Sequence, residues 1–168
     1  MNVRRAIPED LPILREMLVF AARWRSEHEP ADDDALLDDD RLARYVDDWG
    51  RPGDLGVIAE LDGRAVGAAW VRLFPHNRPG YGYIDDEIPE LSIAVAPGRR
   101  AAGIGSALLS ELLQALADAA QVAVSLSVEP DNPARRLYER FGFRKVAAVE
   151  GSWIMRFDLP AGHSPRTT

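Results

Sequence analysis

The chain of 168 residues contains no cysteine. Without thiols it forms no disulfides and has neither thiolate metal ligands nor a cysteine nucleophile. Its three histidines, His28, His76 and His163, are isolated and lack the spacing of a metal site. No apolar run reaches the roughly 18 residues of a membrane span, and the amino terminus lacks the apolar core of a signal peptide. We therefore expect a cytoplasmic protein that has no metal site and no membrane partner.

Positive charge is also scarce, because the formal net charge at pH 7 is −7. This balance argues against a nucleic-acid partner. The acidity is local, since residues 27–48 contain ten acidic and two basic side chains. Two interpretations remain open for this segment. The favoured one is a solvated loop and helix cap, because charge runs are usually solvated. The other is an electrostatic field that attracts a cationic substrate.

Length and patterning predict one domain over residues 1–159 and a disordered tail over residues 160–168. Apolar spacing and capping signals predict helices over 8–25, 39–49, 105–120 and 134–141. Alternating or β-rich runs predict strands over 3–6, 55–61, 64–74, 90–95, 122–128, 143–149 and 153–159. Asp62-Gly63 between two such runs predicts a hairpin. This order predicts a mixed α/β sheet.

The most informative stretch is the glycine-rich loop at residues 95–105, Val-Ala-Pro-Gly-Arg-Arg-Ala-Ala-Gly-Ile-Gly, between a strand and a helix. Free N–H groups at a helix start and nearby arginines favour phosphate. A nucleotide P-loop is disfavoured because Ile104-Gly105 stands where Lys-Ser/Thr is needed. A dinucleotide fingerprint is disfavoured because Leu108 occupies its third glycine position. What remains is the pattern Arg100-x-x-Gly103-x-Gly105.

A second motif lies at residues 128–143, where Asn132, Tyr138, Gly142 and Phe143 follow one another at defined spacing. Together the two motifs resemble the acetyl-CoA-binding motifs of the GCN5-related N-acetyltransferase (GNAT) superfamily. The resemblance covers Val3 to about Leu159 and is weakest in 20–50 and 74–90. It implies an α/β fold with a mixed, mostly antiparallel sheet, a splayed parallel strand pair and flanking helices.

The resemblance further implies that acetyl-CoA is the co-substrate and binds between the strands at 90–95 and 122–128. The backbone of Ile93 and Val95 would pair with the pantetheine arm, which Asn132 would also hold. Arg99, Arg135 and Arg136 would be either ligands of the 3′-phosphate or solvated surface residues. The cofactor-binding residues expected on this basis are Ile93, Ala94, Val95, Arg99, Arg100, Ala101, Ala102, Gly103, Ile104, Gly105, Ser106, Asn132, Arg135 and Tyr138.

The implied activity is transfer of an acetyl group to an amine by direct attack in a ternary complex. An alkylamine has a pKa near 10.4, so a base is useful, and the leaving thiolate needs a proton donor. Tyr138 matches the family's general acid, although it could instead be a core tyrosine with a satisfied hydroxyl. For the base we favour Glu90 and then Glu87, with the other candidates among the loop acids and a histidine: Asp85, Asp86 and His76. Each of these acids could also be merely solvated.

The acceptor is expected to be a small-molecule or peptide amine. Five aromatic residues could line its pocket or belong to the core, namely Trp24, Trp49, Trp70, Tyr81 and Tyr83. A homodimer through the last strand, 153–159, is also expected. The alternatives to catalysis are a noncatalytic acyl-CoA-binding or regulatory module on the same fold and, with less support, a nucleotide-binding protein.

Overall fold

The computed structural model describes residues 1–100 and 102–161, so Ala101 and most of the predicted tail lie outside the described residues. One mixed sheet has the strand order β1-β2-β3-β4-β5-β7-β6. Neighbouring strands are antiparallel except for the parallel pair β4–β5, as predicted. The strands are β1 (Asn2–Arg5), β2 (Leu55–Leu61), β3 (Arg64–Arg72), β4 (Glu90–Val95), β5 (Ala123–Val128), β6 (Arg144–Val149) and β7 (Ser152–Asp158).

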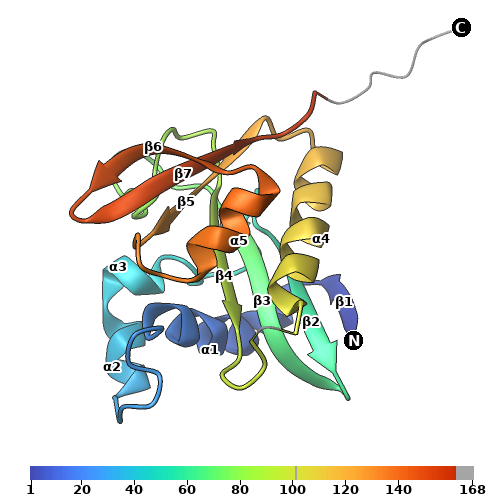
Figure 1. Ribbon diagram of the computed structural model, residues 1–168, viewed down its shortest axis with the longest axis vertical. Coiled ribbons are helices and arrows are strands. Elements are labelled where there is room, and N and C mark those ends of the chain that lie inside the picture. The colour runs from blue at the N-terminus through green and yellow to red at the C-terminus, as the bar shows by residue number, and fades with distance from the viewer. Residues whose placement is uncertain (101, 162–168) are drawn as a thin grey trace, which may run out of the picture.

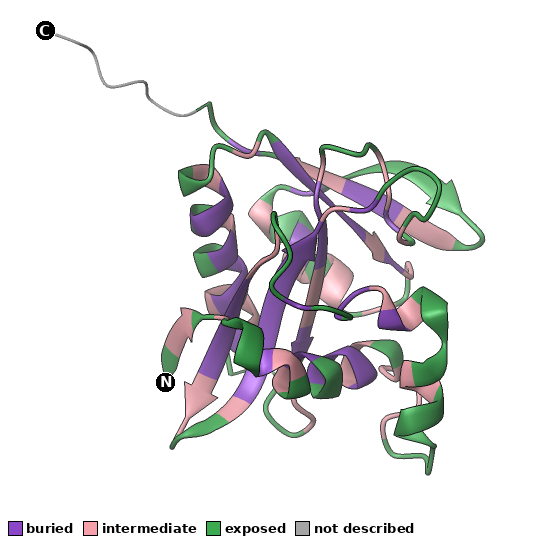
Figure 2. Ribbon diagram, turned by 180° about the vertical axis from the view of Figure 1, so that it is seen from behind, coloured by how far each residue is buried: buried purple, intermediate pink, exposed green. Residues whose placement is uncertain are grey.

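Helices cover both faces of the sheet and enclose two separate apolar cores (Figures 1 and 2). On one face, α4 (Ile104–Asp118) packs on β2, β3 and β4, and α5 (Ala134–Phe141) adds Tyr138 to the same core. On the other, a 3-10 turn (Pro8–Asp10) leads into α1 (Leu11–Ala22), which packs on β3 and β4. None of the helices in the described ranges is long and apolar enough to cross a membrane.

The predicted hairpin joins β2 to β3. Asp62 and Gly63 have φ angles of 52° and 74°, the left-handed values that a two-residue turn between twisted strands requires. The turn fixes the register of β3, and β3 in turn positions β4 beside it.

The parallel pair β4–β5 separates almost at once, as Figure 1 illustrates. Glu90 and Ser125 form the one register pair between described residues of the two strands, and the Ser125 N–H donates to the Pro89 carbonyl at 3.0 Å. Backbone groups of alternate residues point to opposite sides of a strand. Since the Ala96 N–H donates to β3, the N–H and C=O groups of Ile93 and Val95 point into the space between β4 and β5.

The helix predicted over residues 39–49 is wrong in length, because α3 covers Asp40–Ala43 and turns follow it. The physical reason lies on β3. The Arg72 guanidinium donates to the carbonyls of Arg44 (2.9 Å) and Asp47 (2.6 Å), which a continuing helix would bond internally. Asp48 then adopts a left-handed φ of 56°. The tertiary contact therefore overrides the local helical pattern.

The acidic linker also contains a helix that was not predicted, α2 (Asp33–Asp38). Its signal was present in the sequence, because the Asp32 side chain accepts a hydrogen bond from the Ala35 N–H as an N-cap. Asp33 and Asp34 occupy the first turn, where the helix dipole favours acids. Part of the acidic run thus serves to start a helix.

The last strand is not at the edge of the sheet. β7 lies between β5 and β6, so its backbone is paired on both sides, and strand pairing cannot provide the expected dimer contact through residues 153–159. The strand at this edge of the sheet is β6, all of whose residues are exposed, and β1 forms the opposite edge. Because β7 pairs with β5, the sheet continues beyond the splayed strands β4 and β5.

Candidate active site

A polar strip lies on the α1-facing side of the two diverging strands. Ala94 on β4 belongs to the core under α1, so Glu90 and Ser92 face the same way. On β5, the alternate residues Val124, Leu126 and Val128 belong to the core under α4 and α5, so Ser125 and Ser127 face α1. Glu90 and Ser125 are register partners, so a carboxyl group and a hydroxyl group meet where the strands begin to part.

Glu90 is 2% exposed, and its two carboxylate oxygens differ in their partners. Oε1 accepts a hydrogen bond from the Gly82 N–H in the loop between β3 and β4. Oε2 has no hydrogen bond of regular geometry within the described part of the chain, and neither does the fully buried Ser125 hydroxyl. An unpartnered buried polar group is costly, so these atoms indicate a site made to meet a polar ligand.

Burial raises the pKa of Glu90 to about 7, and the Tyr45 hydroxyl and the Gly82 N–H oppose this rise. The nearest cation on the sheet does not neutralise it. Arg72 is the register partner of Glu90 on β3, but its guanidinium pairs with Asp54 at 2.7 Å. A carboxyl group with this pKa is well matched to proton transfer near neutral pH.

The other predicted bases lie in different surroundings. Glu87 is exposed, and its backbone N–H donates to Asp85, a residue of the same loop. Asp86 is exposed and accepts from the Tyr83 hydroxyl and from His76, and these bonds lower its pKa. Asp85 accepts from the Glu87 N–H at 2.9 Å. The structure therefore brings Glu90 alone of these acids to the splayed strands.

Tyr138 lies on the opposite face of the sheet from Glu90. It belongs to the core under α4 and α5, where its ring packs against Phe143 with centroids 5.8 Å apart. Burial raises its pKa above that of a free tyrosine, so the hydroxyl keeps its proton. The opening between β4 and β5 separates Tyr138 from Glu90.

The glycine-rich loop leads from β4 into α4 as predicted. Gly98 and Gly103 have φ angles of 80° and 76°, which side-chain-bearing residues rarely adopt. Gly103 is the N-cap of the 15-residue α4, and no side chain caps that helix start. The N–H groups of Ile104, Gly105 and Ser106 therefore stay available to an anion. Ala102 lies in the same loop, whereas Ala101 falls outside the described residues.

The segment between α1 and α2 contacts both motifs, which the sequence did not suggest. Arg25 pairs with Glu129 and Asp131 just before α5, both at 2.5 Å. Glu27 pairs with Arg100 of the glycine-rich loop at 2.7 Å. This segment therefore links the loop to the start of the second motif, and the Arg100 guanidinium is paired with a carboxylate at the surface.

The remaining predicted cofactor ligands lie around the second motif. The Asn132 side-chain oxygen accepts from the Ala134 N–H at 3.0 Å and so supports the start of α5. Arg135 lies over the Trp153 ring at 5.0 Å and near Glu139 at 3.6 Å. Gly105 lies against α5, since a methyl group there would approach Leu137 to 3.2 Å. The start of α4 is thereby held against the second motif.

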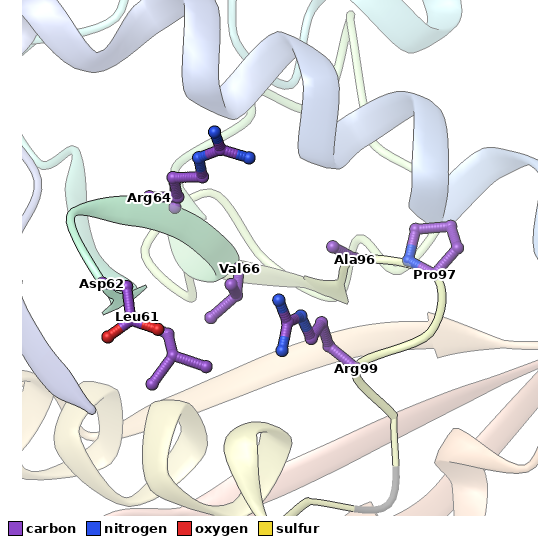
Figure 3. A pocket seen from close by; sticks show the side chains of 8 residues that line it. Leu61, Asp62, Arg64, Val66, Ala96, Pro97 and Arg99 are labelled. Atoms are coloured by element: carbon purple, nitrogen blue, oxygen red, sulfur yellow. The ribbon is translucent and has the colours of Figure 1, made fainter.

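A hollow of about 490 Å³ lies beside the loop, at the tip of the β2–β3 hairpin (Figure 3). Arg99 turns into it toward Val66, and Arg64 extends away on the other side. Its position at the hairpin tip separates it from Glu90. Among the described residues no group of His, Asp and Glu side chains is arranged to hold a metal ion.

The aromatic residues divide between core and site. Trp49 and Trp70 are buried in the core under α1, which is the second of the two places expected for them. Tyr81 is 53% exposed and stacks on Tyr45. Tyr45, beside Glu90, is the residue that sequence reasoning missed, since it was assigned only to an apolar helix stripe. No local pattern relates it to Glu90, 45 positions later in the sequence.

A model of the acetyltransferase (GNAT) family matches residues 14–143. A mycothiol acetyltransferase from Clavibacter sepedonicus is 37% identical over 110 residues, which are 65% of this chain and 32% of that protein. An L-2,4-diaminobutyric acid acetyltransferase from Nocardia farcinica is 36% identical over 147 residues, 80% of this chain and 67% of that protein. The chain thus spans about a third of the mycothiol enzymes that it matches.

Solved structures share the fold. A ribosomal-protein-alanine N-acetyltransferase from Brucella melitensis aligns with a TM-score of 0.67 at 23% identity, covering 95% of this chain and all of that one. A PaiA N-acetyltransferase from Thermoplasma acidophilum in complex with coenzyme A aligns with a TM-score of 0.64 at 17% identity, covering 94% and 99%. Similarity at this level of identity establishes the architecture only.

Proposed function

Because the chain belongs to the acetyltransferase (GNAT) family, we propose that it moves an acetyl group from acetyl-CoA to the primary amine of a small acceptor. The family predicted from the two motifs is confirmed, since the matched residues 14–143 span both of them. The observation that carries the proposal is Glu90, a buried carboxyl group of raised pKa where the parallel strands part.

The donor site would be formed by backbone on two sides. The Ile93 and Val95 N–H and C=O groups, directed between β4 and β5, suit an extended amide arm such as pantetheine. The uncapped start of α4 after Gly103 suits a pyrophosphate. Asn132 retains its side-chain NH₂ group for the same ligand, because its oxygen is occupied at the start of α5. The residues present therefore fit acetyl-CoA, which supplies a thioester carbonyl to the site.

Glu90 and Tyr138 would divide the proton transfers between the two faces of the sheet. The acceptor ammonium would first lose one proton to Glu90, which releases it to solvent. As the neutral amine nitrogen then bonds to the carbonyl carbon and the carbon–sulfur bond breaks, Glu90 takes the second proton from the nitrogen and passes it to solvent in turn. Tyr138 gives its hydroxyl proton to the leaving sulfur and is restored from solvent. Both groups have the required starting state near neutral pH, since Glu90 is partly ionised and Tyr138 is neutral.

The acceptor would be a small cationic amine such as a diamino acid. Glu90, Ser125 and Ser127 offer a carboxylate and hydroxyls, which an ammonium group can satisfy as a donor. The backbone of residues 80–82 lies close against the Glu90 carboxylate. The resulting lack of space favours a small acceptor over a folded protein. Names of two relatives, acetyltransferases of mycothiol and of diaminobutyric acid, agree with a small-molecule acceptor.

We also propose a homodimer through β6 instead of β7. β6 offers an unpaired edge among the described strands, with Val146 and Val149 exposed by 44% and 50%. Analytical ultracentrifugation should find a dimer that Val146→Lys dissociates. A monomeric wild-type protein at about 0.1 mM would rule out this contact.

The function is tested by release of free thiol from acetyl-CoA with a panel of diamines, amino acids, aminoglycosides and peptides. Glu90→Gln should lower kcat/KM for the best acceptor by about 10²–10⁴-fold, the usual worth of a general base. Glu87→Gln, a matched change at an exposed loop acid, should leave it within about twofold. Tight CoA binding without turnover on any amine would instead support a noncatalytic acyl-CoA-binding module.

A further inference from the structure

Glu90 is surrounded by groups from two segments distant in sequence. Tyr45, in the turn after α3, is 7% exposed and contacts the Glu90 carboxylate through its hydroxyl. The same hydroxyl accepts a hydrogen bond from the Tyr81 N–H at 2.7 Å. The Tyr45 ring stacks on Tyr81 at 6.3 Å and meets the edge of Phe74 at 5.0 Å. One side chain therefore joins the catalytic carboxyl group to the loop above it.

Two glycines allow this loop to approach the carboxylate. A methyl group at Gly80 would collide with Glu90 Oε2 and come within 2.8 Å of the Tyr45 hydroxyl. At Gly82 it would collide with Glu90 Oε1 and come within 2.6 Å of the Leu126 carbonyl carbon on β5. At Gly82 the close atoms include β5 backbone, so only glycine fits there, whereas a side chain at Gly80 would have to push the Glu90 and Tyr45 side chains aside. The loop backbone therefore lies directly on Glu90.

The turn that carries Tyr45 is itself fixed from β3. Arg72 donates to the carbonyls on either side of Tyr45, those of Arg44 and Asp47. The Trp70 indole N–H donates to the Tyr45 carbonyl at 3.0 Å. Because Arg72 is also paired with the buried Asp54, its guanidinium cannot turn toward Glu90. The position of the Tyr45 hydroxyl is thus set by the sheet that carries Glu90.

We propose that Tyr45 is a positioning residue for Glu90, holding the carboxylate with the Gly82 N–H so that Oε2 receives the proton of the acceptor amine. This role rests on the proposed function of Glu90. The Oε1 atom is occupied by Gly82, while Oε2 is buried without a regular hydrogen bond in the described structure. Fixing the carboxylate in this way prevents both oxygens from bonding to the loop, which would leave none for the substrate.

The same contact adjusts the protonation of Glu90. Burial raises its pKa, and the Tyr45 hydroxyl and the Gly82 N–H lower it. The other polar neighbours are Ser125, which carries no charge, and Arg72, whose charge is taken by Asp54. Removing the Tyr45 hydroxyl must therefore raise the Glu90 pKa further and reduce the fraction of ionised base at pH 6–7.

The test is Tyr45→Phe, which keeps the ring and its stacking but removes the hydroxyl. The acid limb of the kcat/KM profile should move to higher pH by about 0.5–1 unit, which lowers activity at pH 6 by roughly 3–10-fold. The plateau at pH 9 should stay within about twofold. Tyr81→Phe is the control, because the contact at position 81 is made by the backbone N–H.

A direct titration separates this proposal from the function itself. The carboxyl ¹³C shift of Glu90, assigned by its loss in Glu90→Gln, should report a higher pKa in Tyr45→Phe than in the wild type. Gly80→Ala, which displaces the carboxylate, should also change the titration. An equal loss of activity at every pH with coincident Glu90 titration curves would overturn the positioning role. Full activity of Glu90→Gln would instead refute the function, whatever the titrations show.

Discussion

Replacing Glu90 by glutamine should make the fold more stable at neutral and alkaline pH, although it removes the proposed base. Ionising a carboxyl group that is 2% exposed is costly when no cation lies among the groups that set its pKa. Glutamine keeps the shape and the acceptor oxygen for the Gly82 N–H without carrying a charge. The gain in stability therefore measures the cost of keeping an ionisable base in this position.

The magnitude follows from the difference in pKa between the folded and unfolded chain. The pKa of Glu90 is about 7 in the folded state, against an ordinary value of 4.5. Between these values the native state binds more protons than the unfolded state, so wild-type stability falls as pH rises through this window. At about 1.4 kcal/mol per pH unit, the full loss is about 3 kcal/mol above pH 7. Glu90→Gln should avoid it.

Urea unfolding from pH 4 to 8.5 provides the assay. The free energies of unfolding of wild type and Glu90→Gln should agree near pH 4 and differ by about 2–3 kcal/mol at pH 8, with similar m values. Glu87→Gln is the control, because Glu87 is exposed, and its curve should follow the wild type. If the wild-type and Glu90→Gln curves stayed parallel across this range, Glu90 would not be a destabilised buried base.

Tyr138→Phe should lower kcat about tenfold or more while CoA affinity, measured by calorimetry, changes less than twofold; unchanged kcat would remove this hydroxyl from the mechanism. Glu27→Gln should tighten CoA binding a few-fold at low salt, because it frees Arg100 from a 2.7 Å ion pair. Equal affinity of the two proteins in calorimetry at low salt would contradict this competition. Asp54→Asn should lower the free energy of unfolding by about 3–5 kcal/mol, because it leaves the buried Arg72 charge uncompensated. A loss under 1 kcal/mol in urea would show that Arg72 does not depend on this partner.

The sequence predicts the local structure of the two motifs, because each motif is made from a short contiguous segment. Gly103 must stand before a helix start, and Asn132 and Tyr138 are related by the spacing of a single short helix. These relations are local, so spacing in the chain fixes spacing in space. The family match over residues 14–143 confirms the assignment that these motifs carried. The preference for Glu90 over Glu87 is likewise local, since a residue inside a strand is held by the sheet while a loop acid is solvated.

The surroundings of Glu90 could not be predicted from the sequence, because they are formed by residues that are far apart in the chain. Tyr45 reaches Glu90 only because the chain leaves its helix at Ala43, and that ending depends on Arg72, 28 residues beyond the Arg44 carbonyl that it binds. The apolar spacing at residues 42–49 correctly predicts which side chains are buried. It is wrong about the length of the helix, because that length depends on which groups the backbone carbonyls bond to. A single sequence contains no sign of such a pairing.

Four acids of the acidic segment have local partners in the structure. Asp32 and Asp39 cap helices, so their charges interact with helix starts. Asp40 bonds the guanidinium groups of Arg44 and Arg78, and Glu27 bonds Arg100. These acids are compensated locally, and a compensated charge contributes little field at a distance in salt. Under the proposed function, a cationic acceptor would be recognised by the groups that touch it, namely Glu90 and the serines beside it.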